Sequence, residues 1–131
     1  MTTTNATTTA PTTWVRLYQV FGVLTALLVL FQFITAGQLF GPSDGAVEVH
    51  GAGAIVLHVV SGLAAVAAVL LWRKGTLSIT ALALPVIVFG FTIIQAATGG
   101  RTSLAIHIPG AMILTAGAVW QLIAALRLRR S

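Results

Sequence analysis

Apolar residues gather into four long runs, which are separated by short breaks rich in glycine or charge. The runs extend over about residues 14–40, 50–72, 77–98 and 104–126. Each run has at least about 20 residues, the length that an α-helix needs to cross a hydrocarbon core of about 30 Å. None of them alternates apolar and polar residues with a period of two, which a transmembrane β-barrel would require. The pattern therefore predicts four transmembrane helices.

The breaks between the runs are short. Glycine and proline interrupt the chain at 41–45, Arg73-Lys74-Gly75 follows the second run, and Gly99-Gly100-Arg101 follows the third. Short connections make neighbouring helices antiparallel. We therefore expect an all-α membrane protein, an up-down four-helix bundle over residues 14–131. Residues 1–13 include eight threonines and no charge, so they are predicted to form a disordered cytoplasmic tail.

Composition supports a membrane location. Apolar residues make up 57% of the chain and charged residues 7%, whereas soluble domains carry about 25% charged residues. Because the chain has no cysteine, disulfides and thiolate metal sites are excluded. The bilayer is the expected partner, and nucleic acid is not, because the net charge of +5 comes from residues at helix ends.

The basic residues predict an orientation. One basic residue, Arg101, falls at one membrane face, and six fall at the other if the chain crosses four times. Basic residues favour the cytoplasmic side, so we expect a multi-pass protein of the cell (plasma) membrane with both termini in the cytoplasm. The six residues are Arg16, Arg73, Lys74, Arg127, Arg129 and Arg130.

An internal repeat relates the two halves of the sequence. The second and fourth runs both read H-x-x-G-A-x-x-L, starting from His50 and His107. The first and third runs share Q-x-x-T, starting from Gln32 and Gln95. Two copies of a helical hairpin in the same orientation are related by a pseudo-two-fold axis along the membrane normal. The repeat therefore places the two histidines at the same depth, near the outer face.

A matched histidine pair in a membrane bundle is suited to binding a b-type haem. Each ring would ligate the iron through one nitrogen, while its other nitrogen is held by a carbonyl or a polar side chain. His50 and His107 are the predicted metal ligands. Small residues three and four positions further on share the histidine face and would leave room for the macrocycle; they are Gly53, Ala54, Gly110 and Ala111.

Other interpretations of these residues stay open. The small faces could pack helix on helix, with the histidines bonded to carbonyls or water, and imidazole also suits zinc or copper. The third histidine, His58, could contact the macrocycle edge, bond a glutamine, replace His50 as a ligand, or be a satisfied core residue. Arg101 could pair with a haem propionate or be solvated.

The pattern resembles one four-helix half of the haem A synthase family, and also small uncharacterised four-helix membrane proteins of similar layout. The matching stretches are Glu48-Val-His50, Leu71-Trp72-Arg73, Gln95 to Gly99, and His107 to Ala111. The resemblance implies a bundle with histidines near the outer ends of its second and fourth helices, and a bound haem. The family's acid lies three residues before its histidine and an arginine follows, whereas here Glu48 lies two before and Gly51 follows.

These observations predict an integral membrane b-type haem protein that transfers electrons or senses haem or redox state, with a redox partner. One alternative is a haem-free structural or accessory subunit. A second is a haem-modifying enzyme, but the second four-helix half is missing, so this activity is expected only of a homodimer.

Overall fold

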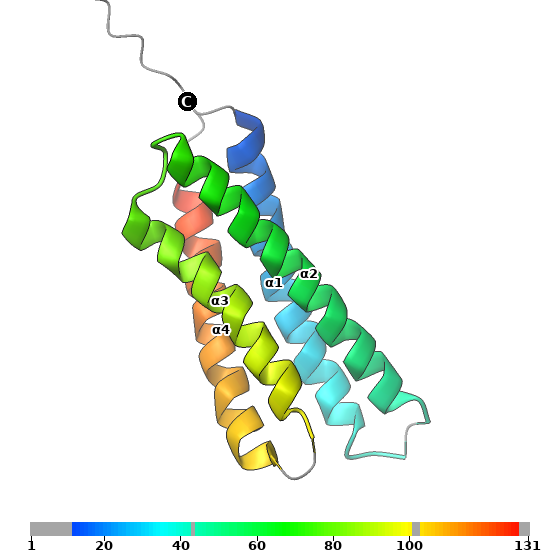
Figure 1. Cartoon of the computed structure of the whole chain (residues 1–131). Helices are drawn as coiled ribbons and strands as arrows, with labels where there is room; N and C mark the ends of the chain where they lie inside the picture. The colour runs from blue at the N-terminus through cyan, green and yellow to red at the C-terminus, as the bar shows by residue number, and fades with distance from the viewer. Residues whose placement is uncertain (1–11, 43, 101–102, 129–131) are drawn as a thin grey trace, which may run out of the picture.

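The structure, a computed structural model, describes residues 12–42, 44–100 and 103–128. It contains four α-helices and, over these residues, no strand. The predicted all-α bundle is therefore confirmed (Figure 1). The helices are α1 (Thr12–Gln38), α2 (Ala46–Arg73), α3 (Ile79–Thr98) and α4 (Leu104–Arg127).

The helix ends differ from the predicted ends by a few residues, most of all for α2. Gly45 has φ of 78°, a left-handed conformation that glycine adopts without strain, and α2 begins directly after it. His50 therefore lies inside the helix, one turn beyond its start. At the other end of the chain, α1 begins at Thr12, within the threonine-rich segment expected to be disordered. The rest of that segment, residues 1–11, lies outside the described residues.

Each helix packs against its neighbours in sequence, and α1 also packs against α4, so that the four helices form a bundle with a square cross-section. The pairs α1–α3 and α2–α4 are consequently diagonal. Both described ends of the chain lie at the end where α2 is joined to α3, and the α1–α2 and α3–α4 connections lie at the opposite end (Figure 1). We call these the termini half and the loop half. The loop half comprises residues 29–58 and 92–114.

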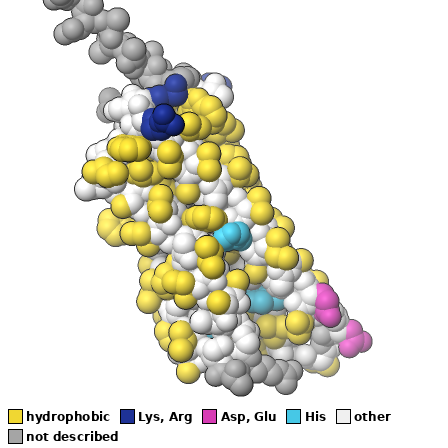
Figure 2. Space-filling model, viewed as in Figure 1, with side chains coloured by type: hydrophobic (Ala, Val, Ile, Leu, Met, Phe, Trp, Pro, Cys, Tyr) yellow, Lys and Arg dark blue, Asp and Glu magenta, His cyan; other side chains and the backbone are white. Residues whose placement is uncertain are grey.

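The surface of the bundle is apolar, as expected for a protein that spans a membrane four times. All four helices are long and apolar enough to cross a bilayer, and large side chains such as Ile87, Met112 and Trp120 are more than half exposed. Figure 2 shows this apolar surface with basic side chains at the termini end and acidic ones at the loop end. Such a surface is stable only in contact with lipid or other apolar partners.

The predicted repeat is visible in the burial pattern. His107 follows His50 by 57 positions, and each buried residue of α4 likewise follows a buried residue of α2 by 57. Four of the five buried residues of α3 similarly follow a buried residue of α1 by 63, the spacing of Gln95 from Gln32. The two hairpins therefore use the same inward faces. The α4 residues are Gly110, Leu114, Ala118, Gln121 and Ala125.

The termini half is tightly packed. Small residues of α2 and α4, such as Ala68 and Ala125, are completely buried and let the helices approach closely. Tyr18 of α1 and Leu71 of α2 belong to the same buried cluster and are 1% and 0% exposed. Gln19 joins α1 to the end of α4 by donating to the carbonyl oxygens of Ala125 at 3.1 Å and Leu128 at 3.2 Å. This end of the bundle fixes the four helices relative to one another.

Candidate functional site

The loop half contains a cavity of about 870 Å³. Residues of all four helices line it, and most of them are apolar. Its volume is in the range of about 300–1,000 Å³ that is usual for small-molecule and cofactor sites. Among its few polar lining groups are all three histidines of the chain and two glutamines of the repeat; these are His50, His58, His107, Gln32 and Gln95.

The ring of His50 is held through one nitrogen. Its Nδ1 lies 2.9 Å from Thr35 Oγ1, and the single proton of that hydroxyl is directed at the backbone carbonyls of Phe31 and Gln32, both at 3.1 Å. With that proton on a carbonyl, the hydroxyl oxygen accepts from His50 Nδ1–H. The lone pair of the neutral ring is then on Nε2. This nitrogen has no hydrogen-bond partner among the described residues.

His107 is held by Gln95 in the equivalent position of the second hairpin. Its Nδ1 lies 3.1 Å from the backbone carbonyl oxygen of Gln95 and 3.0 Å from the side-chain amide nitrogen. The contact with the carbonyl requires Nδ1–H and leaves the lone pair of the neutral ring on Nε2, whereas the contact with the amide requires the other tautomer, so Nδ1 makes one of the two bonds at a time. The two rings belong to diagonal helices and line the same cavity.

Each glutamine of the repeat bridges the backbone of the adjacent histidine helix. With its amide oriented so that both atoms are paired, Gln32 donates to the His50 carbonyl at 3.3 Å and accepts from Ala54 N–H at 2.9 Å. Gln95 likewise donates to the His107 carbonyl and accepts from Ala111 N–H, both at 3.1 Å. In each case the two backbone groups are four residues apart. The glutamines therefore fix the helical turn that carries each histidine.

Two glycines make room for these amides. A Cβ atom at Gly53 would collide with the Gln32 amide, and one at Gly110 would collide with the Gln95 amide. Both glycines were expected to lie against a macrocycle, but neither of them lines the cavity, whereas Ala54 and Ala111 do. The glycines thus serve the glutamine contacts, and the alanines form part of the cavity wall.

His58 lies deeper in the same cavity and makes its own contacts. Its Nδ1 is 2.8 Å from Thr92 Oγ1, and its ring lies against Phe89 with the centroids 4.7 Å apart. Its hydrogen-bond partner is therefore a threonine of α3, and neither glutamine bonds it. Its position in the repeat corresponds to Thr115, so no histidine faces it by symmetry.

The sequence identified the histidines but not the side chains that hold them. Thr35 and Thr92 were not expected to act on the histidines, although Thr35 belongs to the repeated Q-x-x-T. The corresponding Thr98 donates instead to the carbonyl of Ile94 in its own helix, at 2.9 Å, so the repeat alone could not have assigned Thr35. The other predicted contact residue, Arg101, lies outside the described residues.

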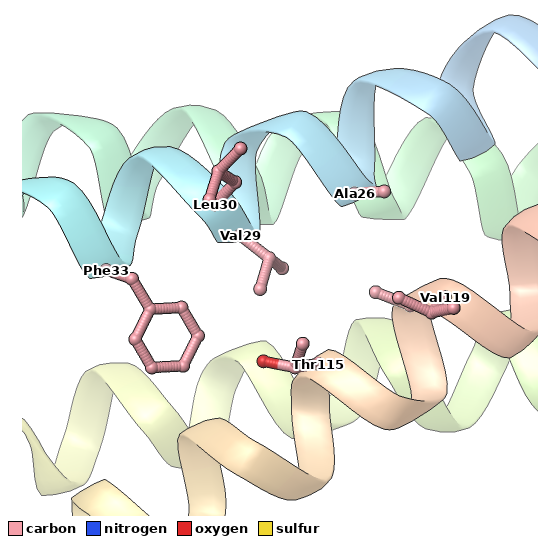
Figure 3. Close-up of a pocket in the computed structure, with 7 residues that line it drawn as sticks. Ala26, Val29, Leu30, Phe33, Thr115 and Val119 are labelled. Carbon is pink, nitrogen blue, oxygen red and sulfur yellow. The ribbon is translucent and has the colours of Figure 1, made fainter.

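A second, smaller hollow of about 230 Å³ lies between α1 and α4. Figure 3 shows Phe33 and Val29 of α1 facing Thr115 and Val119 of α4 across it. Its lining is almost entirely apolar and holds no histidine. The histidines and the glutamines of the repeat therefore line the larger cavity and not this hollow.

The described residues hold no group of three or more His, Cys, Asp or Glu side chains that could hold a metal ion. A zinc site in a protein needs three or four such ligands, so the described ligand set does not fit zinc. The cavity lining offers two imidazoles, one from α2 and one from α4 near the loop end. The site can therefore supply two imidazole nitrogens to a bound group.

Comparison with protein-family models, with curated proteins and with solved structures finds no match to this chain.

Proposed function

We propose that this chain is a membrane-embedded b-type haem protein, in which Nε2 of His50 and Nε2 of His107 are the two axial ligands. The observation that carries the proposal is that the two histidine rings are bonded in the same way. Both Nδ1 atoms are occupied, by Thr35 and by Gln95, and both Nε2 atoms lack a partner among the described residues. A ligating histidine needs this arrangement, because the bond at its second nitrogen fixes the tautomer and the ring orientation.

The cavity fits the remaining requirements of a haem. It is wide, largely apolar, and bounded on the histidine faces by the small side chains of Ala54 and Ala111. An imidazole buried in a membrane without a second partner is costly, and ligation would remove that cost for both rings at once. Bound there, the haem would supply reversible one-electron chemistry. The protein would orient the ligands and keep water away.

Absorption spectroscopy tests the proposal. The protein is purified in detergent from haem-replete cells, and its haem-free form is titrated with haem. We expect one haem per chain and a reducible, six-coordinate b-type spectrum, which His50→Ala and His107→Ala each abolish. The matched control is His58→Ala, which removes the third imidazole of the same cavity and should leave the spectrum six-coordinate.

A colourless protein that binds no added haem would overturn the proposal and leave the structural-subunit interpretation. Loss of the spectrum in His58→Ala together with its retention in His50→Ala would reassign one ligand. A dimer that modifies a bound haem would restore the enzyme interpretation. The same purified protein preparations distinguish these outcomes.

The proposed location is the cell membrane with both termini in the cytoplasm. The described basic side chains support it, because Arg16, Arg73, Lys74 and Arg127 are all at the termini end of the bundle, and basic residues favour the cytoplasmic side. Asp44 and Glu48 lie at the loop end. Labelling of single cysteines tests it: Val47→Cys should react from outside the cell and Gly75→Cys only after permeabilisation. The reverse pattern would invert the topology.

A further inference from the structure

The side chain of His58 is polar on both ring edges, and only one edge is paired. Thr92 Oγ1 donates its single proton to the backbone carbonyl of Phe89 at 2.6 Å. With its proton on that carbonyl, the hydroxyl oxygen accepts from His58 Nδ1–H, 2.8 Å away. The neutral ring then carries its lone pair on Nε2, which has no hydrogen-bond partner among the described residues. His58 thus offers a fixed hydrogen-bond acceptor.

This acceptor is distinct from the histidine pair. His58 is eight residues beyond His50 along α2, which is about 12 Å at 1.5 Å per residue. Both residues line the same cavity. Because the repeat partner of His58 is Thr115, the symmetry that matches His50 with His107 gives His58 no opposing imidazole. Its free ring nitrogen is therefore open to a different ligand group.

The surroundings of His58 restrict what that group can be. The ring of His58 lies in the interior of the spanning helix α2. Its neighbours Ile55 and Val59 are more than half exposed on the apolar surface of the bundle. Water is scarce at such a depth, so an unpaired acceptor there is costly. The complementary ligand is apolar and carries a hydroxyl that can donate. Phe89 packs against the imidazole with the centroids 4.7 Å apart and helps to hold the ring in place, without itself lining the cavity.

We infer that the His58–Thr92 corner of the cavity is a binding subsite for the reduced head group of a lipid-soluble quinol, whose hydroxyl donates to His58 Nε2. The inference rests on the proposed function, because a quinol would act here as the electron donor of the haem protein. It names the chemical class of the redox partner that would reach the histidine pair through the membrane. It also predicts selectivity for the redox state. A quinol has hydroxyl donors, whereas the corresponding quinone has only carbonyl acceptors, which cannot bond a bare lone pair.

Ligand binding to the haem-free protein tests the inference separately from haem. The protein in lipid nanodiscs is titrated with a benzoquinol that carries a ten-carbon alkyl chain, and with the corresponding benzoquinone. We expect the quinol to bind at least about tenfold more tightly, because only the quinol can donate to the unpaired acceptor. In ¹⁵N spectra of histidine-labelled protein, the Nε2 resonance of His58 should shift with quinol, while those of His50 and His107 shift less.

Two variants identify the group that is responsible. His58→Phe keeps a flat ring beside Phe89 but removes the acceptor, so quinol and quinone should then bind equally. Thr115→Val is the matched control at the repeat-equivalent position, and it should keep the quinol preference. Folding of each variant is checked by its helical circular dichroism and by haem binding at the His50–His107 pair.

Several results would overturn the inference. Equal binding of quinol and quinone to the unsubstituted protein would do so, and so would a quinol preference that survives in His58→Phe. Tight binding of decanol, comparable with that of the quinol, would show a general alcohol site instead. A quinol preference in a protein that never binds haem would leave this inference standing and refute the proposed function alone. A b-type haem spectrum without a quinol preference would leave the proposed function standing and refute the quinol subsite alone.

Discussion

The two halves of the bundle are built from the same four helices but differ in what lies between them. In the termini half, alanines, Tyr18 and Leu71 form a buried, closely packed core. In the loop half, the same inward faces surround a cavity of about 870 Å³, lined by three histidines and two glutamines. Helices in lipid associate by close packing rather than by hydrophobic exclusion, so the tight half can maintain the arrangement while the open half carries polar groups that would be costly in a packed interior. The following predictions test this division, from the largest expected effect to the smallest.

Truncation of a core side chain should be most costly in the termini half. Leu71 is 0% exposed, so Leu71→Ala should lower the free energy of unfolding by about 2–5 kcal/mol. Ile55→Ala removes a side chain that lines the cavity and is 68% exposed, and it should cost less than about 1 kcal/mol. Unfolding in mixtures of mild detergent and dodecyl sulfate, followed by circular dichroism, measures both. Equal losses would show that the halves do not differ in packing.

The loop half should be sensitive at two particular glycines. In Gly110→Ala, the new methyl group would collide with the Gln95 amide, so we expect a loss of about 1–3 kcal/mol and weaker haem binding. Gly53→Ala should behave in the same way through Gln32. The matched control is Gly51→Ala, where a Cβ atom meets nothing within 4 Å and the greater helix propensity of alanine favours a neutral or slightly stabilising effect. A Gly110→Ala variant with unchanged stability and haem affinity would contradict the role given to the amide.

Two buried glutamines on neighbouring helices, Gln95 in the loop half and Gln121 in the termini half, should respond in opposite directions. Gln95 bonds the backbone of α4, so Gln95→Leu should lower stability by about 0.6–1.7 kcal/mol, the range for bonds between membrane helices. Gln121 is completely buried, and its two amide atoms have no hydrogen-bond partner in the described part of the chain. Gln121→Leu should therefore be neutral or stabilising. The same unfolding measurement distinguishes the two, and a large loss in Gln121→Leu would reveal a partner for that amide.

The smallest expected effect compares two threonines at different places in the repeat. Thr92 bonds His58 across the α2–α3 interface, so Thr92→Val should cost about 0.6 kcal/mol and make the His58 ring more mobile in ¹⁵N relaxation spectra. Thr115 bonds only the carbonyl of Ala111 in its own helix, at 2.7 Å, and Thr115→Val should have almost no effect. Indistinguishable spectra of His58 in the two variants would contradict the contact with Thr92.

Much of the fold could be predicted from the sequence because its signals are local or periodic. Run length gave the four helices, and the match of His50 with His107 gave the repeat that the burial pattern shows. The helix starts were less accurate, because a left-handed residue such as Gly45 can begin a helix among residues that read as a loop.

For the contacts inside the cavity, the sequence predicted the type of partner but not the residue that provides it. The expectation that a carbonyl or polar side chain holds each histidine agrees with the structure, but Thr35 and Gln95 fill these roles differently in the two hairpins. Which residue bonds each histidine depends on the rotation of each helix about its axis, and a sequence repeat does not specify this rotation. The division into a packed half and an open half arises in the same way, from the placement of alanines and glycines against particular side chains.

The central claim is that the repeat creates one pair of axial ligands, one from each hairpin. Electron paramagnetic resonance of the oxidised, haem-loaded protein tests it most directly. The account predicts a low-spin signal of bis-imidazole type, which becomes high-spin in both His50→Ala and His107→Ala and stays low-spin in His58→Ala. A signal that remains low-spin in His50→Ala, or one that is high-spin before any substitution, would contradict the claim.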